Sequence, residues 1–298
     1  MNNLRGILLL VAAMAGFAVE DALIKAAAAS VPVGQILMLL GIGGATIFGT
    51  LARLQGARLL TPVVFTRPVL LRNAAEMLGT MTFVNAIALL PLSTVTAILQ
   101  ATPLAVTLGA ALFLGAEVGW RRWTAILVGF AGVLIIVRPG AGGVEAGALL
   151  AVAGVFFLAA RDLATRATPA SVPSSVIATY GFASVIPAGA ILLTFSGGAM
   201  IPGPRAALLI AAALVIGVFA YYAIIAAMRV GEIAVVTPFR YTRLLFAVGI
   251  GMAVFGERPD ALTYLGAALV IGSGLYTLLR EARLSHRQRT LSPDVPGS

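Results

Sequence analysis

The chain has 298 residues, of which 60% are hydrophobic and only 10% are charged, and its mean hydropathy is +1.03. A soluble domain carries about 25% charged residues, so this composition excludes a soluble enzyme and a soluble nucleic-acid-binding protein despite the net charge of +9. The absence of cysteine excludes disulfides and thiolate chemistry. We expect the cations to lie in loops and set membrane topology, with no nucleic-acid partner.

Ten apolar stretches follow one another along the chain, each bounded by proline, glycine or charge, and each predicts a membrane-spanning helix. They cover residues 4–29, 33–53, 69–90, 92–115, 120–138, 144–166, 173–195, 204–229, 232–255 and 260–280. The first stretch resembles a signal peptide in composition, but its counterpart in the second half lies mid-chain, so we expect it to be retained. The polar, basic tail, residues 282–298, is predicted to be disordered at the cytoplasmic surface.

A repeat joins the first stretch to the sixth. Residues 18–32 read AVEDALIKAAAASVP, and residues 159–173 read AARDLATRATPASVP, with seven identities at an offset of 141. In so apolar a chain, this repeat predicts two homologous halves, residues 1–140 and residues 141–281.

The distribution of Lys and Arg predicts how these halves are oriented. With a cytoplasmic N-terminus, thirteen cations fall on the inside and four on the outside, namely Lys25, Arg138, Arg205 and Arg258. This bias predicts that both termini are cytoplasmic and that the number of spans is even. Ten spans give five to each half, so the second half is inverted. The predicted fold is therefore an all-α membrane protein of ten transmembrane helices in two inverted five-helix repeats, a design typical of alternating-access transporters.

The ninth stretch places Arg240, Tyr241 and Arg243 close to the middle of the bilayer. An arginine there costs at least about 2.5–3.5 kcal/mol on insertion scales, so it must face a cavity or a partner. One reading is that a guanidinium receives an anionic group of the substrate, such as a carboxylate, through two parallel hydrogen bonds. The alternative is an internal ion pair with an acid on a neighbouring helix.

Three other stretches contribute polar or aromatic candidates for substrate binding. Gln100 lies on a polar face of the fourth stretch, where an amide offers both a donor and an acceptor, although contacts between helices are an alternative. Glu76 and Met81 lie in the third stretch, where the acid can pair with an arginine, bind an ammonium group or carry a proton. Tyr221 and Tyr222 in the eighth stretch can form an aromatic wall or serve only in packing.

The repeated segment carries its own charged residues. Asp21 with Lys25, and Asp162 with Arg166, have the i,i+4 spacing of ion pairs within one helix. We expect these to be ion pairs near helix ends that can also latch a gate. The single histidine, His286, lies in the tail, and no phosphate-binding glycine loop is present. We therefore expect no enzyme activity, no catalytic residue, no metal and no cofactor.

Several segments resemble a known family. PLAVTLGAALFLGAE, which runs from Pro103 to Glu117, and the following LVGFAGVLIIV resemble the EamA-type repeat of the drug/metabolite transporter superfamily. AVGIGMAVFGE and LGAALVIGSGLYTLL resemble its second copy, so the resemblance covers residues 4–280. Within the superfamily, TPFRYTRLLFAV looks most like the YddG-type aromatic amino acid exporters of bacterial inner membranes. Arg243 stands where the family proline is expected when Glu257 is aligned with Glu117.

The resemblance implies a multi-pass protein of the bacterial inner membrane that exports aromatic and other neutral amino acids, or similar small metabolites, from the cytoplasm. We expect a monomer whose partners are the small-molecule substrate and the lipid bilayer. The substrate carboxylate would bind Arg240 or Arg243, with the substrate body against the tyrosines and Met81. A proton-coupled exporter of cationic drugs or other metabolites, using Glu76 or Glu20, is the main alternative. A channel and a membrane enzyme are further alternatives.

Overall fold

The computed structural model describes residues 2–116, 118–139, 145–169, 171–230 and 232–291, and the regular elements of this part of the chain are all helices. The first repeat supplies α1 (Asn2–Ala28), α2 (Val33–Leu54), the 3-10 helix η1 (Pro62–Phe65), α3 (Arg67–Leu89), α4 (Leu92–Leu99), α5 (Thr102–Phe113) and α6 (Trp120–Val137). The second supplies α7 (Ala146–Arg166), α8 (Ser174–Phe195), α9 (Pro204–Val230), α10 (Ile233–Val236), η2 (Thr237–Tyr241), α11 (Thr242–Phe255) and α12 (Ala261–Leu291). Glu117 lies outside the described residues.

Eight segments of the described chain are long and apolar enough to cross a membrane, with α4 and α5 together forming one of them. The third and ninth predicted spans are not among the eight. Helix α3 contains Arg67, Arg72 and Glu76, and the ninth span is divided among α10, η2 and the 14-residue α11. The count of ten spans therefore stays a prediction, and each of its two remaining members carries charged residues inside the bundle, Arg72 and Glu76 in the third and Arg240 and Arg243 in the ninth.

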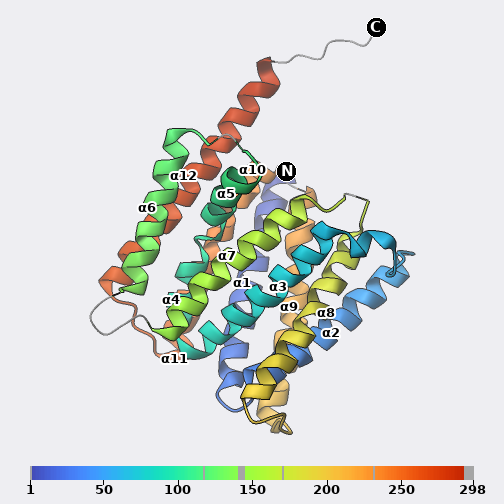
Figure 1. Cartoon of the computed structure of the whole chain (residues 1–298). Coiled ribbons are helices and arrows are strands. Elements are labelled where there is room, and N and C mark those ends of the chain that lie inside the picture. The colour runs from blue at the N-terminus through green and yellow to red at the C-terminus, as the bar shows by residue number, and fades with distance from the viewer. Residues whose placement is uncertain (1, 117, 140–144, 170, 231, 292–298) are drawn as a thin grey trace.

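Helix α12 extends beyond the predicted tenth span. It continues to Leu291, so residues 282–291 of the predicted disordered tail are helical. Residues 292–298 lie outside the described part of the chain. The start of α1 and the end of α12 lie at the same end of the bundle (Figure 1).

Helices from the two halves pack against each other in a reciprocal way. Helix α1 packs on α9 and α7 packs on α3, while α2 packs on α8 and α6 packs on α12. Helices α3 and α7 lie side by side through the middle of the bundle (Figure 1). Since α7 corresponds to α1 and α9 corresponds to α3 in the repeat, exchanging the halves turns the α1–α9 contact into the α7–α3 contact. The α2–α8 and α6–α12 contacts each map onto themselves. This pattern is what two repeats related by a two-fold axis produce.

The contact between α2 and α8 depends on glycine, because the two backbones meet closely. A Cβ atom at Gly34 would lie 2.5 Å from the Gly189 carbonyl oxygen and 2.8 Å from the Leu193 backbone nitrogen. Backbone atoms cannot rotate away as a flexible side chain can. Small residues at such contacts let membrane helices approach each other, and here they hold the two halves together.

We expect Gly34→Ala to destabilise the protein by about 1–3 kcal/mol, because the added methyl group must push α8 away from α2. The thermal unfolding midpoint of the purified protein in detergent measures this effect. Gly272→Ala in α12 is the matched control, since no atom lies within 4 Å of a Cβ placed there. That variant is expected to gain about 0.5–1 kcal/mol from reduced backbone entropy. Equal midpoints for the two variants would contradict the close α2–α8 contact.

Candidate functional site

The fourth and ninth predicted spans are both interrupted, and the two interruptions meet. Helix α4 ends at Leu99 and α5 begins at Thr102, while η2 separates α10 from α11. The side-chain Nε2 of Gln100 donates a hydrogen bond of 3.1 Å to the Tyr241 carbonyl oxygen, and this contact is buried. The two residues are separated by the repeat offset of 141. Discontinuous helices at corresponding positions of two repeats are the strongest pointer to a transporter binding site.

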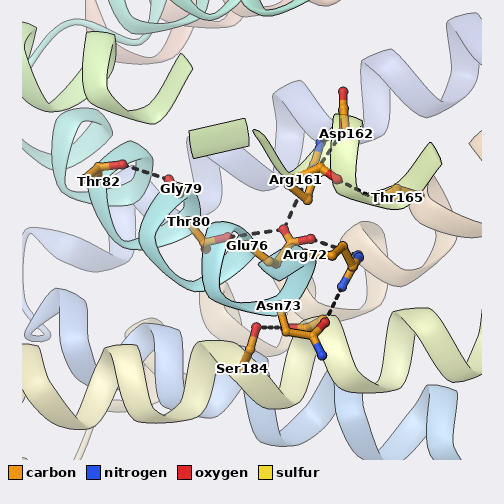
Figure 2. A network of polar contacts seen from close by, with 11 residues as sticks. Arg72, Asn73, Glu76, Gly79, Thr80, Thr82, Arg161, Asp162, Thr165 and Ser184 are labelled. Carbon is orange, nitrogen blue, oxygen red and sulfur yellow. Dashed lines mark hydrogen bonds and ion pairs between the residues drawn. The ribbon is translucent and has the colours of Figure 1, made fainter. Parts of the chain in front are cut away.

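A charged network links α3 and α7 (Figure 2). We call Arg72, Glu76, Arg161 and Asp162 the charged network. Glu76 accepts a hydrogen bond of 2.9 Å from Arg72 and one of 3.2 Å from Arg161. Arg161 also pairs with Asp162 at 2.8 Å. The two acids and two arginines therefore neutralise one another between the halves.

The charged network remains partly accessible. The side chains of Glu76, Arg161 and Asp162 retain 15%, 27% and 29% exposure, whereas that of Arg72 retains 6%. The Nη1 atom of Arg72 would lie 2.6 Å from a Cβ atom at Gly181 of α8, so the absence of a side chain there makes room for the guanidinium. The Arg161 end of the charged network is thus less enclosed than the Arg72 end.

Tyr221 of α9 stands next to the charged network. All four members of that network act electrostatically on its hydroxyl group. Its ring packs edge-on against Phe48 of α2, with the ring centroids 5.1 Å apart. Tyr221 therefore presents an aromatic ring held by packing and a polar group close to the ion pairs, as a substrate wall requires.

Arg240 differs from the arginines of the charged network. It lies in η2 and is half-buried. Asp162, Arg161 and Arg243 act on it electrostatically, yet it forms no hydrogen bond or ion pair of its own with any described residue. Arg72, Arg161 and Arg243 each hold a carboxylate. Of the four arginines Arg72, Arg161, Arg240 and Arg243, Arg240 is thus the one that holds no carboxylate among the described residues.

Arg243 has the environment of a structural ion pair. Its Nη2 atom lies 2.5 Å from Oδ2 of Asp21, whose side chain is only 5% exposed. The guanidinium also lies 5.3 Å from the ring centroid of Phe17 and 5.5 Å from that of Phe83, within range of cation–π attraction. Of the two arginines predicted to bind a substrate anion, Arg243 is therefore already occupied.

The predicted ion pairs within one helix are not the ones that the structure forms, so this prediction was wrong for both repeats. Asp21 binds Arg243 from α11 instead of Lys25, and Asp162 binds Arg161 instead of Arg166. The i,i+4 spacing permits these pairs, but a partner closer to each carboxylate is available in the folded bundle. Arg166 is exposed at the end of α7.

Lys25 joins α1 to the turn between α3 and α4. Its ammonium group donates hydrogen bonds to the carbonyl oxygens of Ile87, at 2.9 Å, and Leu90. On the other side of the turn, Glu257 accepts hydrogen bonds from the backbone nitrogens of Leu92 and Ser93, at 2.5 and 3.0 Å. A cation thus caps the end of α3 and an anion caps the start of α4, as their helix dipoles favour.

The remaining predicted residues divide between core and surface. The Tyr241 ring is buried, and its hydroxyl group points at Gly274 of α12, so its contribution near the interruption is its backbone carbonyl. Tyr222 is 59% exposed on the same outer stripe of α9 as Phe219 and Val215, so it does not share the surroundings of Tyr221. Met81 is half-buried in α3, and its carbonyl oxygen accepts a hydrogen bond from Asn85.

Three charged residues of the buried region were not among the predicted substrate-binding or gate residues. Arg72 was counted among the cytoplasmic cations that set the topology, so it was not considered as a site residue. Its i,i+4 spacing to Glu76 nevertheless indicates an ion pair. Arg161 adjoins Asp162 in the repeated segment, and Glu20 adjoins Asp21 in the same way. The sequence offers no signal for which of these residues meet across the bundle.

Comparisons with known proteins agree on the type of protein. The EamA-like transporter family matches residues 4–138 and 145–279. A riboflavin transporter of Vibrio cholerae is 32% identical over 66% of this chain, and the match spans 65% of that relative, just under two thirds of its length. A pseudopaline exporter of Pseudomonas aeruginosa is 29% identical over 89% of this chain and 93% of the relative.

Two further comparisons reach lower identity. An S-adenosylmethionine uptake transporter of Rickettsia conorii is 22% identical over 74% of each chain. A solved crystal structure aligns with a TM-score of 0.62 and 19% identity, covering 94% of this chain and 98% of the other, which shows a shared fold.

Proposed function

Since this chain belongs to the EamA-like transporter family, within the drug/metabolite transporter superfamily, we propose that it moves a small metabolite with an anionic group by alternating access, and that Arg240 binds that group. The proposal places the protein in a bacterial inner membrane with ten spans and both termini in the cytoplasm. The halves rock against each other, and the substrate lies between them near the interrupted spans.

The observation that carries the proposal is the unpaired guanidinium of Arg240. An arginine without an internal anion inside a membrane protein is costly to keep unless a ligand or water satisfies it. A carboxylate or phosphate group matches the planar fork of a guanidinium with two parallel hydrogen bonds. Asp162 and Arg161, which act on Arg240 electrostatically, would contact the other polar groups of the substrate.

The substrate body would lie against Tyr221, while Gln100 acts as a positioning residue. By binding the Tyr241 carbonyl, Gln100 holds η2 against the interruption of the fourth span. This arrangement supports amino acids, each of which has a carboxylate, as candidate substrates for export. The relatives named for riboflavin, pseudopaline and S-adenosylmethionine extend the candidates to other small metabolites.

The charged network argues against a cation exporter that relies on Glu76. That carboxylate is bound by two arginines, so a cationic drug would have to compete with both. An enzyme is also disfavoured, since the relatives are transporters and the sequence has no cysteine and a single histidine, His286, in the tail.

A counterflow screen tests the proposal. The purified protein is reconstituted in liposomes that are loaded with one unlabelled compound, and entry of the same compound in labelled form is followed. The panel contains the twenty amino acids, riboflavin and S-adenosylmethionine. We expect saturable exchange of at least one compound with a carboxylate or other anionic group. Exchange confined to uncharged compounds would contradict the assigned role of Arg240, and linear, non-saturating flux would indicate a channel.

A further inference from the structure

Four acids lie within the described predicted spans away from the helix ends, and three of them hold an arginine. Asp21 binds Arg243, while Glu76 and Asp162 share Arg161. Glu20 is the fourth. Its carboxylate forms no hydrogen bond and no ion pair with any described residue, although it lies next to Asp21 in α1.

The carboxylate of Glu20 rests against the backbone of α9. A Cβ atom at Gly217 would lie 2.6 Å from its Cδ atom and 2.9 Å from its Oε2 atom. Helix α1 belongs to the first repeat and α9 to the second, and they pack along each other. Glu20 therefore lies at a contact between the halves, where a relative movement of the halves changes its surroundings.

The repeat shows what this position lacks. At the offset of 141, Glu20 corresponds to Arg161 and Gly217 corresponds to Glu76. In the contact between α7 and α3, Arg161 and Glu76 form an ion pair of 3.2 Å. In the contact between Glu20 and Gly217, an acid faces a glycine. The glycine has no side chain, so it cannot supply the charge that would neutralise Glu20.

The charged groups that act on Glu20 are Asp21 on its own helix and Arg243 on α11. These two neutralise each other at 2.5 Å. Other helices that pack against α1 also carry titratable groups. Glu76 and Arg72 of α3 are bound to each other, and Tyr221 of α9 stands beside the charged network. Arg240 of η2 interacts electrostatically with Asp162. Glu20 is thus left with no dedicated counter-charge.

We propose that Glu20 is the proton-binding site that couples transport to a pH gradient. An unpaired carboxylate is stable in a bilayer interior as the neutral acid and in water as the anion. When the halves open the α1–α9 contact to one side, a hydronium ion there protonates the carboxylate, forming one O–H bond and releasing water. When the contact opens to the other side, water accepts the same proton. One proton moves per cycle.

The proton site is tested first without any substrate. Infrared difference spectra of the purified protein in nanodiscs are recorded as the pH is raised, and the carboxylic acid C=O band is followed. We expect a titrating component of this band that is present in the wild type and in Glu145→Gln, whose changed residue lies in a loop before α7, but is missing in Glu20→Gln. An unchanged titrating band in Glu20→Gln, or no titrating band in the wild type, would overturn the proposal. Glu20→Asp retains a carboxyl group and is expected to keep the band.

The coupling rests on the proposed transport function and is tested separately. Labelled phenylalanine and riboflavin are the probes, in liposomes with the membrane potential clamped at zero. For one proton per substrate, a gradient of about one pH unit supports an accumulation ratio of about tenfold. We expect Glu20→Gln to abolish this accumulation and to keep counterflow. Gradient-driven accumulation at the wild-type level in Glu20→Gln would overturn the coupling. If neither probe is transported, phenylalanine and riboflavin are excluded as substrates, while the infrared titration still decides the proton site.

Discussion

Replacing Arg240 with alanine is expected to weaken binding of an anionic substrate by roughly ten- to a hundredfold. Hydrogen bonds to a charged group contribute about 1.5–3 kcal/mol, and about 1.4 kcal/mol corresponds to a factor of ten in affinity. The concentration of substrate that gives half-maximal counterflow measures the change. Arg240→Lys keeps the charge but loses the planar fork, so an intermediate value is expected.

The stability of the same variant separates a binding role from a structural one. Arg240 has no internal anion, so its removal leaves no buried acid without a partner, and the unfolding midpoint of Arg240→Ala should not fall. Arg161→Ala should lower the midpoint, because Glu76 and Asp162 both lose a bound cation. Arg258→Ala in the exposed loop before α12 is the control for both measurements. Wild-type affinity for the anionic substrate in Arg240→Ala would refute the binding role.

The ion pair between Asp21 and Arg243 is expected to dominate the stability of the contact between α1 and α11. Removing one partner of a buried pair costs about 3–5 kcal/mol, since the other charge is left uncompensated. Asp21→Asn and Arg243→Gln should therefore each lower the free energy of unfolding by about that amount. Unfolding by denaturant in detergent, followed by tryptophan fluorescence, supplies the values.

The double variant Asp21→Asn, Arg243→Gln should recover part of the loss, because no charge then remains unpaired. A coupling energy above about 0.5 kcal/mol marks a direct interaction. Additive losses in the double variant would show that the two side chains act independently. Arg243→Gln is also expected to transport more than Arg240→Ala at equal protein amounts, as the pair stabilises the bundle without binding the substrate.

The sequence predicted the scaffold well because the signals that define it are local or periodic. Apolar stretches of about 20 residues and the repeat at an offset of 141 lead to the helical bundle and its two EamA repeats. The interruption at Gln100 also lies in a polar face that the sequence makes visible. Glycine and proline mark most of the helix ends that the structure shows.

The ion-pair partners of the buried charged residues could not be predicted from the sequence, because contacts between helices across the bundle determine them. Asp21 and Arg243 are 222 residues apart, so the nearer Lys25 looked like the natural partner. Tyr221 and Tyr222 are neighbours in sequence, yet one faces the charged network and the other faces outward, since successive helical residues point in different directions. The exact register of α9 decides between them.

The matching cations of the repeat occupy unlike environments. Lys25 is bound to the carbonyl oxygens at the end of α3, whereas Arg166 is exposed at the end of α7. If inverted repeats exchange conformations during transport, the two cations exchange these environments as well. Arg166 would then cap the end of α9, where Met228 corresponds to Ile87, and Lys25 would be released. Under the proposed alternating access, the structure would then be the endpoint in which Lys25 is bound, and the other endpoint would be the one in which Arg166 is bound.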